Sequence, residues 1–429
     1  MPNRIDGIVA RLHGLHPRLI DLSLDRLLTL LDKLGNPQLR LPPVLHVAGT
    51  NGKGSTCAFL RAMSQAAGKR VHVYTSPHLV RWNERIRIAG KLVSDAALEA
   101  AFEHVEQVNA GAPITVFEVN TAVAFHLFAT TPADVCILEV GLGGRGDATN
   151  VIDKPAACAI ASISLDHRDL LGDTLAAIAA EKAGIMKPGV PVAIGAQPPE
   201  VLNVLLDHAS RIGAPVHLRG RGWQVVPLPV GFQYRDHNGT LDLPPPSLPG
   251  AFQLDNAGIA IAAIRVSGLA LPNAAIATGI ATAEWPARLQ RLRGELAALL
   301  PHDWELWLDG GHNPGAAAVL AEHLRSWNDQ PVHLIVGMKR SKDSEEFLRP
   351  LLPLAATVWA VAEEHQHDAR SVEEIVAASG GVARQGPRVA NALRAARREP
   401  GPARVLICGS LYLAGEVLQQ DLNGQAPDA

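Results

Sequence analysis

The residues with the clearest chemical potential form a glycine-rich segment that runs from Gly49 to Ser55, Gly49-Thr50-Asn51-Gly52-Lys53-Gly54-Ser55. An apolar run precedes it and a helical pattern follows it. Glycines let successive backbone N–H groups turn toward an anion, a helix N-terminus adds the positive end of a dipole, and Lys53 adds a full charge. The segment therefore predicts triphosphate binding. It departs from the GxxxxGK[ST] pattern, because Gly54 separates Lys53 from the hydroxyl of Ser55. A glycine-rich strand-to-helix turn without a ligand is the alternative.

A second glycine cluster, Gly141 to Gly146, matches the GxGxxG pattern of dinucleotide-binding proteins, and Asp166 lies 20 residues further on. In those proteins a helix opens at the third glycine. Here residues 147–155 lead into another strand, so a dehydrogenase is the weaker interpretation. Glu139 ends the preceding strand, at the carboxyl edge where open α/β sheets collect ligands. Its alternative role is a structural ion pair with a lysine.

Short apolar runs rich in β-branched residues, each ended by Gly, Ser or Asp, alternate with helical patterns. Such alternation predicts a parallel sheet covered by helices on both faces. The predicted strands are 44–49, 70–76, 134–141, 157–164 and 190–195, and the predicted helices are 55–67, 95–108, 120–130 and 173–184.

Residues 226–250 interrupt this rhythm with six prolines and an alternating segment around Asn238-Gly239, which predicts a small antiparallel hairpin. Helical patterns at 254–268 and 272–283 follow. The alternation then resumes with strands at 305–310, 332–337, 357–362 and 404–410 and helices at 314–326, 343–353, 371–379 and 388–398. We therefore expect an α/β protein with an N-terminal phosphate-loop domain (1–284), a linker (285–296) and a smaller Rossmann-like C-terminal domain (297–429).

Composition excludes several classes of protein. The 429 residues carry a formal charge of only −3, so no overall basic field exists to hold nucleic acid. The four cysteines form no CxxC pair and are predicted to be buried thiols in a reducing compartment. No apolar run reaches the length of roughly 18 residues that a membrane span requires, and the N-terminus lacks the pattern of a signal peptide. We expect a cytoplasmic protein without nucleic-acid or membrane partners.

Further motifs carry a resemblance that covers nearly the whole chain. The sequence resembles the folylpolyglutamate synthase and dihydrofolate synthase family, which belongs to the ATP-dependent amide ligases that include the cell-wall Mur ligases. The matching motifs are TSPHL and ERIRI (75–79, 84–88), EVGLGGRGDATN (139–150), LDHRDLLG (165–172), AAEKAGIMKPG (179–189), WPARLQ (285–290), LDGGHNPGA (308–316) and GSLYLAGEV (409–417). Gly146 stands where family members often carry Leu, and Phe252 stands where many have His.

The resemblance implies specific roles. It implies ATP binding by the segment Gly49, Thr50, Asn51, Gly52, Lys53, Gly54 and Ser55 and by Asn256, Arg288, Asp309 and His312. Two Mg²⁺ ions would be held by Ser55, Ser76, Glu139 and His167. The pteridine-bearing acid would contact Asp21, Leu22, Ser23, Leu24, Phe117, Glu118, Gly146, Asp147 and Ala148, and Ser410 would lie near the incoming glutamate.

Lys182 has two different interpretations, one from its position in a predicted helix and one from the resemblance. A lysine in the last turn of a helix ordinarily complements the helix dipole. The resemblance instead implies that Lys182 is carbamylated and acts catalytically with Lys53 and His167.

The implied reaction adds L-glutamate to 7,8-dihydropteroate and to reduced folates through an acyl phosphate, by a chain that we expect to be a monomer. The alternatives are a Mur-type ligase acting on a cell-wall precursor and a nucleotide-binding protein without turnover.

Overall fold

The computed structural model describes residues 4–18 and 20–421, and these form two compact units. The first unit holds the chain up to Ile163, His167–Ser247 and Gln253–Glu284. The second holds Ser164–Asp166, Leu248–Phe252 and the chain from Trp285 onward. Short segments 164–166 and 248–252 thus pack with the second unit although their chain neighbours belong to the first.

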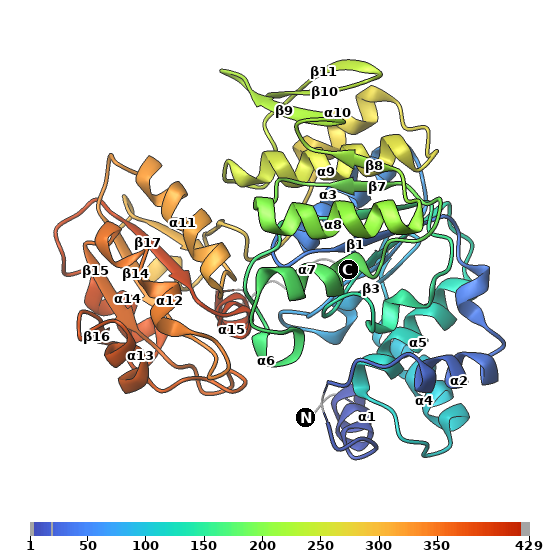
Figure 1. Cartoon of the computed structure of the whole chain (residues 1–429). Coiled ribbons are helices and arrows are strands. Elements are labelled where there is room, and N and C mark those ends of the chain that lie inside the picture. The colour runs from blue at the N-terminus through green and yellow to red at the C-terminus, as the bar shows by residue number, and fades with distance from the viewer. Residues whose placement is uncertain (1–3, 19, 422–429) are drawn as a thin grey trace. The chain divides into compact units, whose positions relative to one another are not determined.

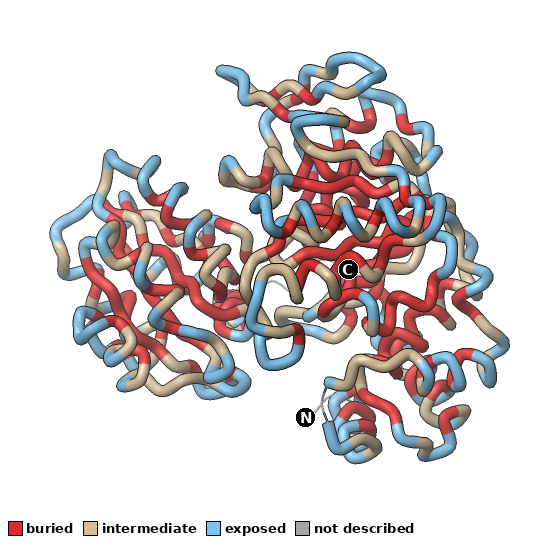
Figure 2. Tube along the Cα trace, in the orientation of Figure 1, coloured by how far each residue is buried: buried red, intermediate tan, exposed pale blue. Residues whose placement is uncertain are grey.

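The first unit is built on an eight-stranded sheet with the order β4-β3-β2-β5-β1-β6-β7-β8 (Figure 1). Strands β2, β5, β1, β6, β7 and β8 run parallel to one another. At the β2 edge, β3 pairs antiparallel with β2, and β4 pairs antiparallel with β3. The central strands are buried along their whole length, as the apolar runs predicted (Figure 2). The strands are β1 (Val44–Ala48), β2 (Val71–Tyr74), β3 (Ile86–Ile88), β4 (Lys91–Leu92), β5 (Val135–Glu139), β6 (Ala157–Ile160), β7 (Val192–Ile194) and β8 (Val216–Leu218).

Helices connect these strands and pack on the sheet. Near the N-terminus, helices α1, α2, α4 and α5 bury a common apolar cluster that includes Leu12, Leu27, Phe102 and Phe125. The helices of the unit are α1 (Arg4–His13), α2 (Asp25–Lys33), α3 (Lys53–Ala66), α4 (Asp95–Asn109), α5 (Val116–Thr130), α6 (Arg168–Leu171), α7 (Leu175–Ala183), α8 (Pro199–Ile212), α9 (Phe252–Val266) and α10 (Asn273–Thr282), with 3₁₀ turns at Pro37–Arg40, Trp82–Arg85 and Ala148–Val151.

Helix α3, which follows the phosphate loop, is almost wholly buried, from Gly54 to Ser64. Helix α10 crosses it at a glycine. A Cβ atom on Gly279 would lie 2.3 Å from the backbone nitrogen of Met63 and 2.4 Å from its Cα. The two helix backbones therefore touch here, and only glycine permits this separation.

The antiparallel excursion is a three-stranded sheet of β9 (Trp223–Pro227), β10 (Phe232–Asp236) and β11 (Gly239–Leu243). The predicted hairpin is present, but its two-residue loop is His237-Asn238 rather than Asn238-Gly239, because Asp236 pairs with Gly239. The Asp236 carboxylate fixes this register by accepting a hydrogen bond of 2.8 Å from the amide of Asn238.

The second unit contains a six-stranded sheet with the order β12-β13-β17-β14-β15-β16, in which only β12 is antiparallel. The α/β fold class is therefore confirmed for both units. The strands are β12 (Gln290–Leu292), β13 (Glu305–Leu308), β14 (Val332–Val336), β15 (Thr357–Ala360), β16 (Arg384–Gln385) and β17 (Arg404–Cys408). The helices are α11 (Pro314–Ser326), α12 (Ser344–Leu348), α13 (Val372–Ala378), α14 (Val389–Ala396) and α15 (Leu411–Asp421), with 3₁₀ turns at Ala297–Leu299 and Leu352–Leu354.

The predicted helix 343–353 is shorter than expected. Helix α12 ends at Leu348, and a separate 3₁₀ turn covers Leu352–Leu354. Pro350 and Pro353 explain the break, because neither can donate the backbone hydrogen bond that would continue the helix.

All four cysteines, Cys57, Cys136, Cys158 and Cys408, are free and buried, as predicted. Burial raises the pKa of each thiol above its usual value. None of the helices within residues 4–18 and 20–421 is long and apolar enough to cross a membrane.

Candidate functional site

The phosphate loop lies between β1 and α3, as the sequence predicted, and its backbone is tightly packed. The amides of Thr50 and Asn51 donate hydrogen bonds of 2.8 and 3.1 Å to the carbonyl of Ser162. Gly52 has a φ of +85°, and a Cβ on it would lie 2.3 Å from Oδ1 of Asn256. Glycine is thus required here by both conformation and space.

The loop lysine and hydroxyl are both held in place. Nζ of Lys53 donates to the carbonyls of Gly49 and Thr50 at 3.1 and 3.2 Å, so its charge lies at the loop. Ser55 is buried in the first turn of α3, and its Oγ accepts a hydrogen bond of 3.3 Å from Nε2 of Gln253. These positions fit a lysine and a hydroxyl that serve a triphosphate.

Helix α9 joins the loop to another predicted ATP residue. Asn256 Nδ2 donates to Gln253 Oε1 at 2.9 Å, and Gln253 in turn reaches Ser55. The structure therefore brings Asn256 to the phosphate loop. Gln253, which belongs to the same network, was missed as a functional residue because its partner Ser55 lies 198 residues earlier in the chain.

Two of the predicted metal ligands meet at the carboxyl edge of the sheet. Glu139 ends β5 beside Val47 of β1, and its Oε2 accepts a hydrogen bond of 3.3 Å from the backbone amide of Ser76. Glu139 is only 4% exposed. His167, which precedes α6, has a left-handed backbone with φ +49°. Residues 4–18 and 20–421 contain no group of three or more His, Cys, Asp or Glu that could hold a metal ion.

That donor set fits magnesium bound with a nucleotide. Mg²⁺ usually takes one or two carboxylates, keeps several waters and binds substrate phosphates, so it does not need an all-protein cage. The buried hydroxyl of Ser55 and the carboxylate of Glu139 are hard oxygen donors of this kind.

The dinucleotide interpretation of the second glycine cluster is wrong. No α-helix opens at Gly146; a 3₁₀ turn covers Ala148–Val151 and leads into β6. Asp147 caps this turn. Its Oδ1 accepts from the amide and hydroxyl of Thr149 at 3.0 and 2.6 Å, and its Oδ2 accepts from the amide of Leu142 at 2.8 Å. Burial raises the pKa of Asp147. The carboxylate therefore fixes the shape of the glycine loop.

A buried histidine continues this network. His46 on β1 lies 2.8 Å from the Thr149 hydroxyl through its Nε2. Burial lowers the pKa of His46 to about 3, with a smaller contribution from the charge of Lys187. His46 is therefore neutral near pH 7.

The residues predicted to contact the pteridine-bearing acid lie close together. Segment 21–24 precedes α2, and a Cβ on Gly146 would lie 3.0 Å from both Cβ and O of Leu22. Phe117 packs against Gly141, where a Cβ would lie 2.3 Å from its ring. The loop 141–148 thus contacts both the early segment and the start of α5. Ser23 and Leu24 continue that segment, and the Ser23 amide donates to the Asp21 carbonyl at 3.1 Å.

Lys182 is the next-to-last residue of α7 and is only 4% exposed. A lysine that merely complements a helix dipole at the surface would not be buried to this extent. The glycine loop packs directly against it, since a Cβ on Gly144 would lie 2.9 Å from the Lys182 Cα. The amide of Arg145 also donates to the carbonyl of Glu181 at 2.8 Å.

In the second unit, the other predicted ATP residues gather after β13. The buried Asp309 accepts hydrogen bonds from the amides of Leu289 and Gly311 at 2.9 and 2.7 Å, and burial raises its pKa. Arg288 lies beside Gly310, where a Cβ would be 2.9 Å from its Nη1. His312 Nδ1 is 2.9 Å from the carbonyl of Gly310. Asp309 to His312 thus form one turn after β13, and Arg288, from before β12, lies against it.

Two helix caps clarify roles in this unit. The cap of α11 is Asn313, whose Oδ1 accepts from the amide of Ala316 at 2.9 Å, so Asp309 does not cap this helix. Ser410 is buried at the start of α15, and its Oγ accepts from the amides of Tyr412 and Leu413 at 3.1 and 3.4 Å. Ser410 therefore stabilises a helix start, and its contact with glutamate stays a prediction.

Asp166 forms a buried polar cluster that the sequence did not reveal. Its carboxylate pairs with Lys342, accepts a hydrogen bond of 3.1 Å from Asn313 Nδ2, and lies 3.5 Å from Nε2 of His312. The side chains of Asp166 and Lys342 are only 10% and 11% exposed. Since 176 residues separate the two, no local pattern could have predicted the pair.

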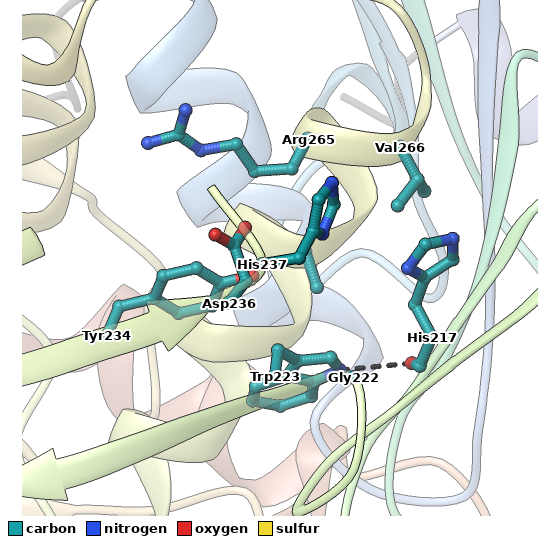
Figure 3. Close-up of a pocket in the computed structure, with 9 residues that line it drawn as sticks. His217, Gly222, Trp223, Tyr234, Asp236, His237, Arg265 and Val266 are labelled. Atoms are coloured by element: carbon teal, nitrogen blue, oxygen red, sulfur yellow. Dashed lines mark hydrogen bonds between the residues drawn. The ribbon is translucent and has the colours of Figure 1, made fainter. Parts of the chain in front are cut away.

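A small hollow elsewhere in the first unit contains none of the predicted site residues. Figure 3 shows it between the three-stranded sheet and α9, with the Trp223 indole donating to the carbonyl of His217 at 3.0 Å. Its volume is about 10 Å³, which is room for about one water. It is too small to hold a substrate.

Comparisons with known proteins cover both units. Family models match at residues 47–195 (Mur ligase middle domain) and 293–420 (dihydrofolate synthetase, C-terminal domain). The chain is 36% identical to the dihydrofolate synthase/folylpolyglutamate synthase of Escherichia coli over 95% of this chain and 93% of that protein.

Solved structures agree over nearly the full length. E. coli FolC in complex with DHPP and ADP superposes with a TM-score of 0.89 at 35% identity and covers 97% of each chain. A bifunctional folylpolyglutamate synthase/dihydrofolate synthase with Mn, AMPPNP and L-glutamate bound gives a TM-score of 0.86 at 34% identity, again over 97% of each chain.

Proposed function

Because the chain belongs to the dihydrofolate synthase/folylpolyglutamate synthase family of the Mur ligase superfamily, we propose that it joins L-glutamate to 7,8-dihydropteroate and to reduced folates, with ATP as the energy source. The observation that carries this proposal is the phosphate loop held by α9 through Gln253 and Asn256, within a chain related to such ligases over 95% of its length. The enzyme is an ATP-dependent acid–amino-acid ligase.

The chemistry explains why this class of enzyme needs ATP. A carboxylate oxygen is a poor leaving group, so the γ-phosphoryl of ATP is first transferred to it, giving an acyl phosphate and ADP. The glutamate amine then attacks the acyl carbon, an amide forms, and phosphate and a proton leave. Catalysis depends mainly on positioning and on stabilising negative charge. Lys53 and the backbone N–H groups of the phosphate loop would stabilise the negative charge of the triphosphate.

We propose that Ser55 and Glu139 hold one Mg²⁺ ion, and that Ser76, Glu139 and His167 hold a second. When bound, the ions would neutralise phosphate and carboxylate charge. The bound Mn of the related structure supports a divalent ion in this family. The contact between the Ser76 amide and Glu139 fixes the carboxylate at the sheet edge.

We propose Asn256, Arg288, Asp309 and His312 as further ATP residues. We propose that Lys182 carries a carbamate, formed with CO₂, that converts a buried cation into an anionic oxygen group. Its 4% exposure supports this role, since burial away from water disfavours a positively charged side chain. Native mass spectrometry at neutral pH should show an adduct of one CO₂ that Lys182→Ala lacks; an identical mass in bicarbonate and in its absence would contradict the proposal.

The acyl substrate would lie against Leu22, Phe117 and the loop that ends in Gly146, Asp147 and Ala148. The substrates are small molecules, as in the related structures with DHPP, nucleotide or glutamate bound. We further propose that the enzyme acts as a cytoplasmic monomer without nucleic-acid or membrane partners.

The decisive experiment measures ADP release by purified protein with Mg²⁺, ATP, L-glutamate and either dihydropteroate or tetrahydrofolate. Turnover should require every component, and mass spectrometry should find one added glutamate on each acid. A protein that releases ADP only with a uridine-nucleotide cell-wall precursor would instead be a Mur-type ligase. If no ADP is released with either class of acid, the proposal is contradicted.

A further inference from the structure

Two of the acids predicted to lie near the pteridine meet on one arginine. Arg26, in the first turn of α2, donates from Nη1 to Oδ2 of Asp21 at 2.9 Å. Its Nε donates to Oε2 of Glu118 at 3.3 Å. Asp21 and Glu118 are 97 positions apart in the chain, and a single guanidinium joins them.

Glu118 is fixed from a second direction as well. In the capping box of α5, its Oε2 also accepts a hydrogen bond of 2.8 Å from the amide of Thr115. The Glu118 side chain is only 3% exposed, whereas those of Arg26 and Asp21 are 23% and 28% exposed. The Glu118 carboxylate is thus buried and held by two partners, the Thr115 amide and the Arg26 guanidinium.

The second oxygen of Glu118 is different. Oε1 is buried and lies 3.2 Å from Nη2 of Arg26, yet it has no hydrogen-bond partner among the described residues. The nearby guanidinium charge offsets part of the cost of burying this oxygen. Arg26 therefore contacts both oxygens of the Glu118 carboxylate and fixes its orientation.

The charges indicate what kind of ligand fits. Asp21 and Glu118 carry two negative charges and Arg26 one positive charge, and His16 Nε2 lies 3.5 Å from Oδ2 of Asp21. The cluster keeps acceptor oxygens and excess negative charge at the start of α5, where Phe117 packs against Gly141 of the glycine loop. A flat heterocycle that presents N–H donors on its edge would be favoured over one that presents acceptors.

We propose that Arg26 is a positioning residue that sets pteridine specificity, by holding Asp21 and Glu118 so that they accept hydrogen bonds from the amino and ring N–H groups of the pteridine. This inference rests on the proposed function. Without the guanidinium, two neighbouring carboxylates would repel one another, and neither would be held in the position that it has beside Arg26. Arg26 acts through these acids and need not touch the reacting carboxylate.

The test compares Arg26→Ala and Arg26→Lys with wild type in steady-state kinetics. Because the perturbation lies at the pteridine end, we expect KM for dihydropteroate to rise at least tenfold in Arg26→Ala, with kcat changed less than threefold and KM for ATP unchanged. Lysine cannot bridge two carboxylates with a planar fork, so Arg26→Lys should restore only part of the loss.

The matched control is Arg11→Ala. Arg11 forms a comparable arginine–glutamate pair with Glu106, at 3.1 and 2.7 Å, between helices α1 and α4. Its removal should leave every kinetic constant unchanged.

A second measurement separates positioning from a merely structural role. Wild type should prefer dihydropteroate over an analogue in which hydrogen replaces the 2-amino group, and Arg26→Ala should lose most of that preference. An unchanged KM, or an unchanged preference in folded Arg26→Ala and Arg26→Lys, would overturn the inference. Loss of folding in both variants would assign Arg26 to stability alone and also overturn it. A wild type that does not use dihydropteroate would instead refute the proposed function.

Discussion

The contact between α10 and α3 predicts that one methyl group will disturb the phosphate-loop helix. Gly279→Ala would place a Cβ 2.3 Å from the Met63 nitrogen, whereas ordinary van der Waals contacts begin more than 1 Å further away. The obstacle is backbone, which cannot rotate aside as a flexible side chain would. The helices must separate, or α3 must shift.

The expected size of the effect follows from two opposing terms. Replacing glycine by alanine inside a helix stabilises it by about 1 kcal/mol. Overpacking a well-packed contact costs typically about 1–3 kcal/mol and sometimes more. Since the clash here involves two backbone atoms, we expect the unfavourable term to exceed the favourable one, and the free energy of unfolding to fall by about 1–2 kcal/mol.

Gly7→Ala provides the control with the same chemical change. Gly7 lies within α1, and a Cβ there would meet nothing within 4 Å. This variant should be up to about 1 kcal/mol more stable than wild type. Both are measured by urea unfolding and by KM for ATP, which should rise only in Gly279→Ala because α3 carries Lys53 and Ser55. A Gly279→Ala protein as stable as Gly7→Ala would refute the reasoning.

Three further outcomes are expected. Lys53→Ala and Glu139→Ala should each abolish ADP release while circular dichroism stays that of wild type; normal turnover in either would remove that residue's proposed role. Gly146→Leu should push Leu22 away, since even a Cβ would lie 3.0 Å from it, and should raise KM for the pteridine acid while KM for ATP stays constant; equal changes in both would argue for a general loss of structure. His46 has a folded-state pKa of about 3, below the ordinary value near 6.5. Between these two pH values His46 is protonated in the unfolded chain but not in the native state. The free energy of unfolding should therefore fall as pH drops below about 6.5, by up to about 1.4 kcal/mol per pH unit. Urea unfolding of His46→Gln at pH 5 and 7 should show a smaller pH dependence than wild type, and an equal dependence would contradict this assignment.

Features that depend on neighbouring residues were predictable from the sequence. The strand, the phosphate loop and the helix that follows it are contiguous, so their order alone indicated the anion site. The exclusion of a dinucleotide fold likewise needed only the residues after Gly146. The hairpin was also predicted correctly. Its loop lies one residue earlier than predicted, because Asp236, the last residue of β10, accepts a hydrogen bond from the amide of Asn238.

Interactions between distant segments could not be predicted in this way. Gln253 supports Ser55 across 198 positions, and Arg26 reaches Glu118 across 92. Neither residue type is distinctive where it stands, since glutamine and arginine are ordinary on the surface of a helix. Only the packing of α9 on the loop, and of α2 on α5, gives them partners. Asp166 was noticed for its distance from a glycine motif, and its true partner is Lys342.

The burial of every native thiol has a practical consequence for experiments. Thiolates, which are the reactive form, are scarce when burial raises a cysteine pKa, so maleimide reagents should react slowly with the native protein. A single cysteine introduced at the exposed hairpin loop residue Asn238, or at Val382, which is 60% exposed, would then be the preferred site of attachment. Fluorophores or spin labels can thus be placed on either unit without first removing the four natural cysteines.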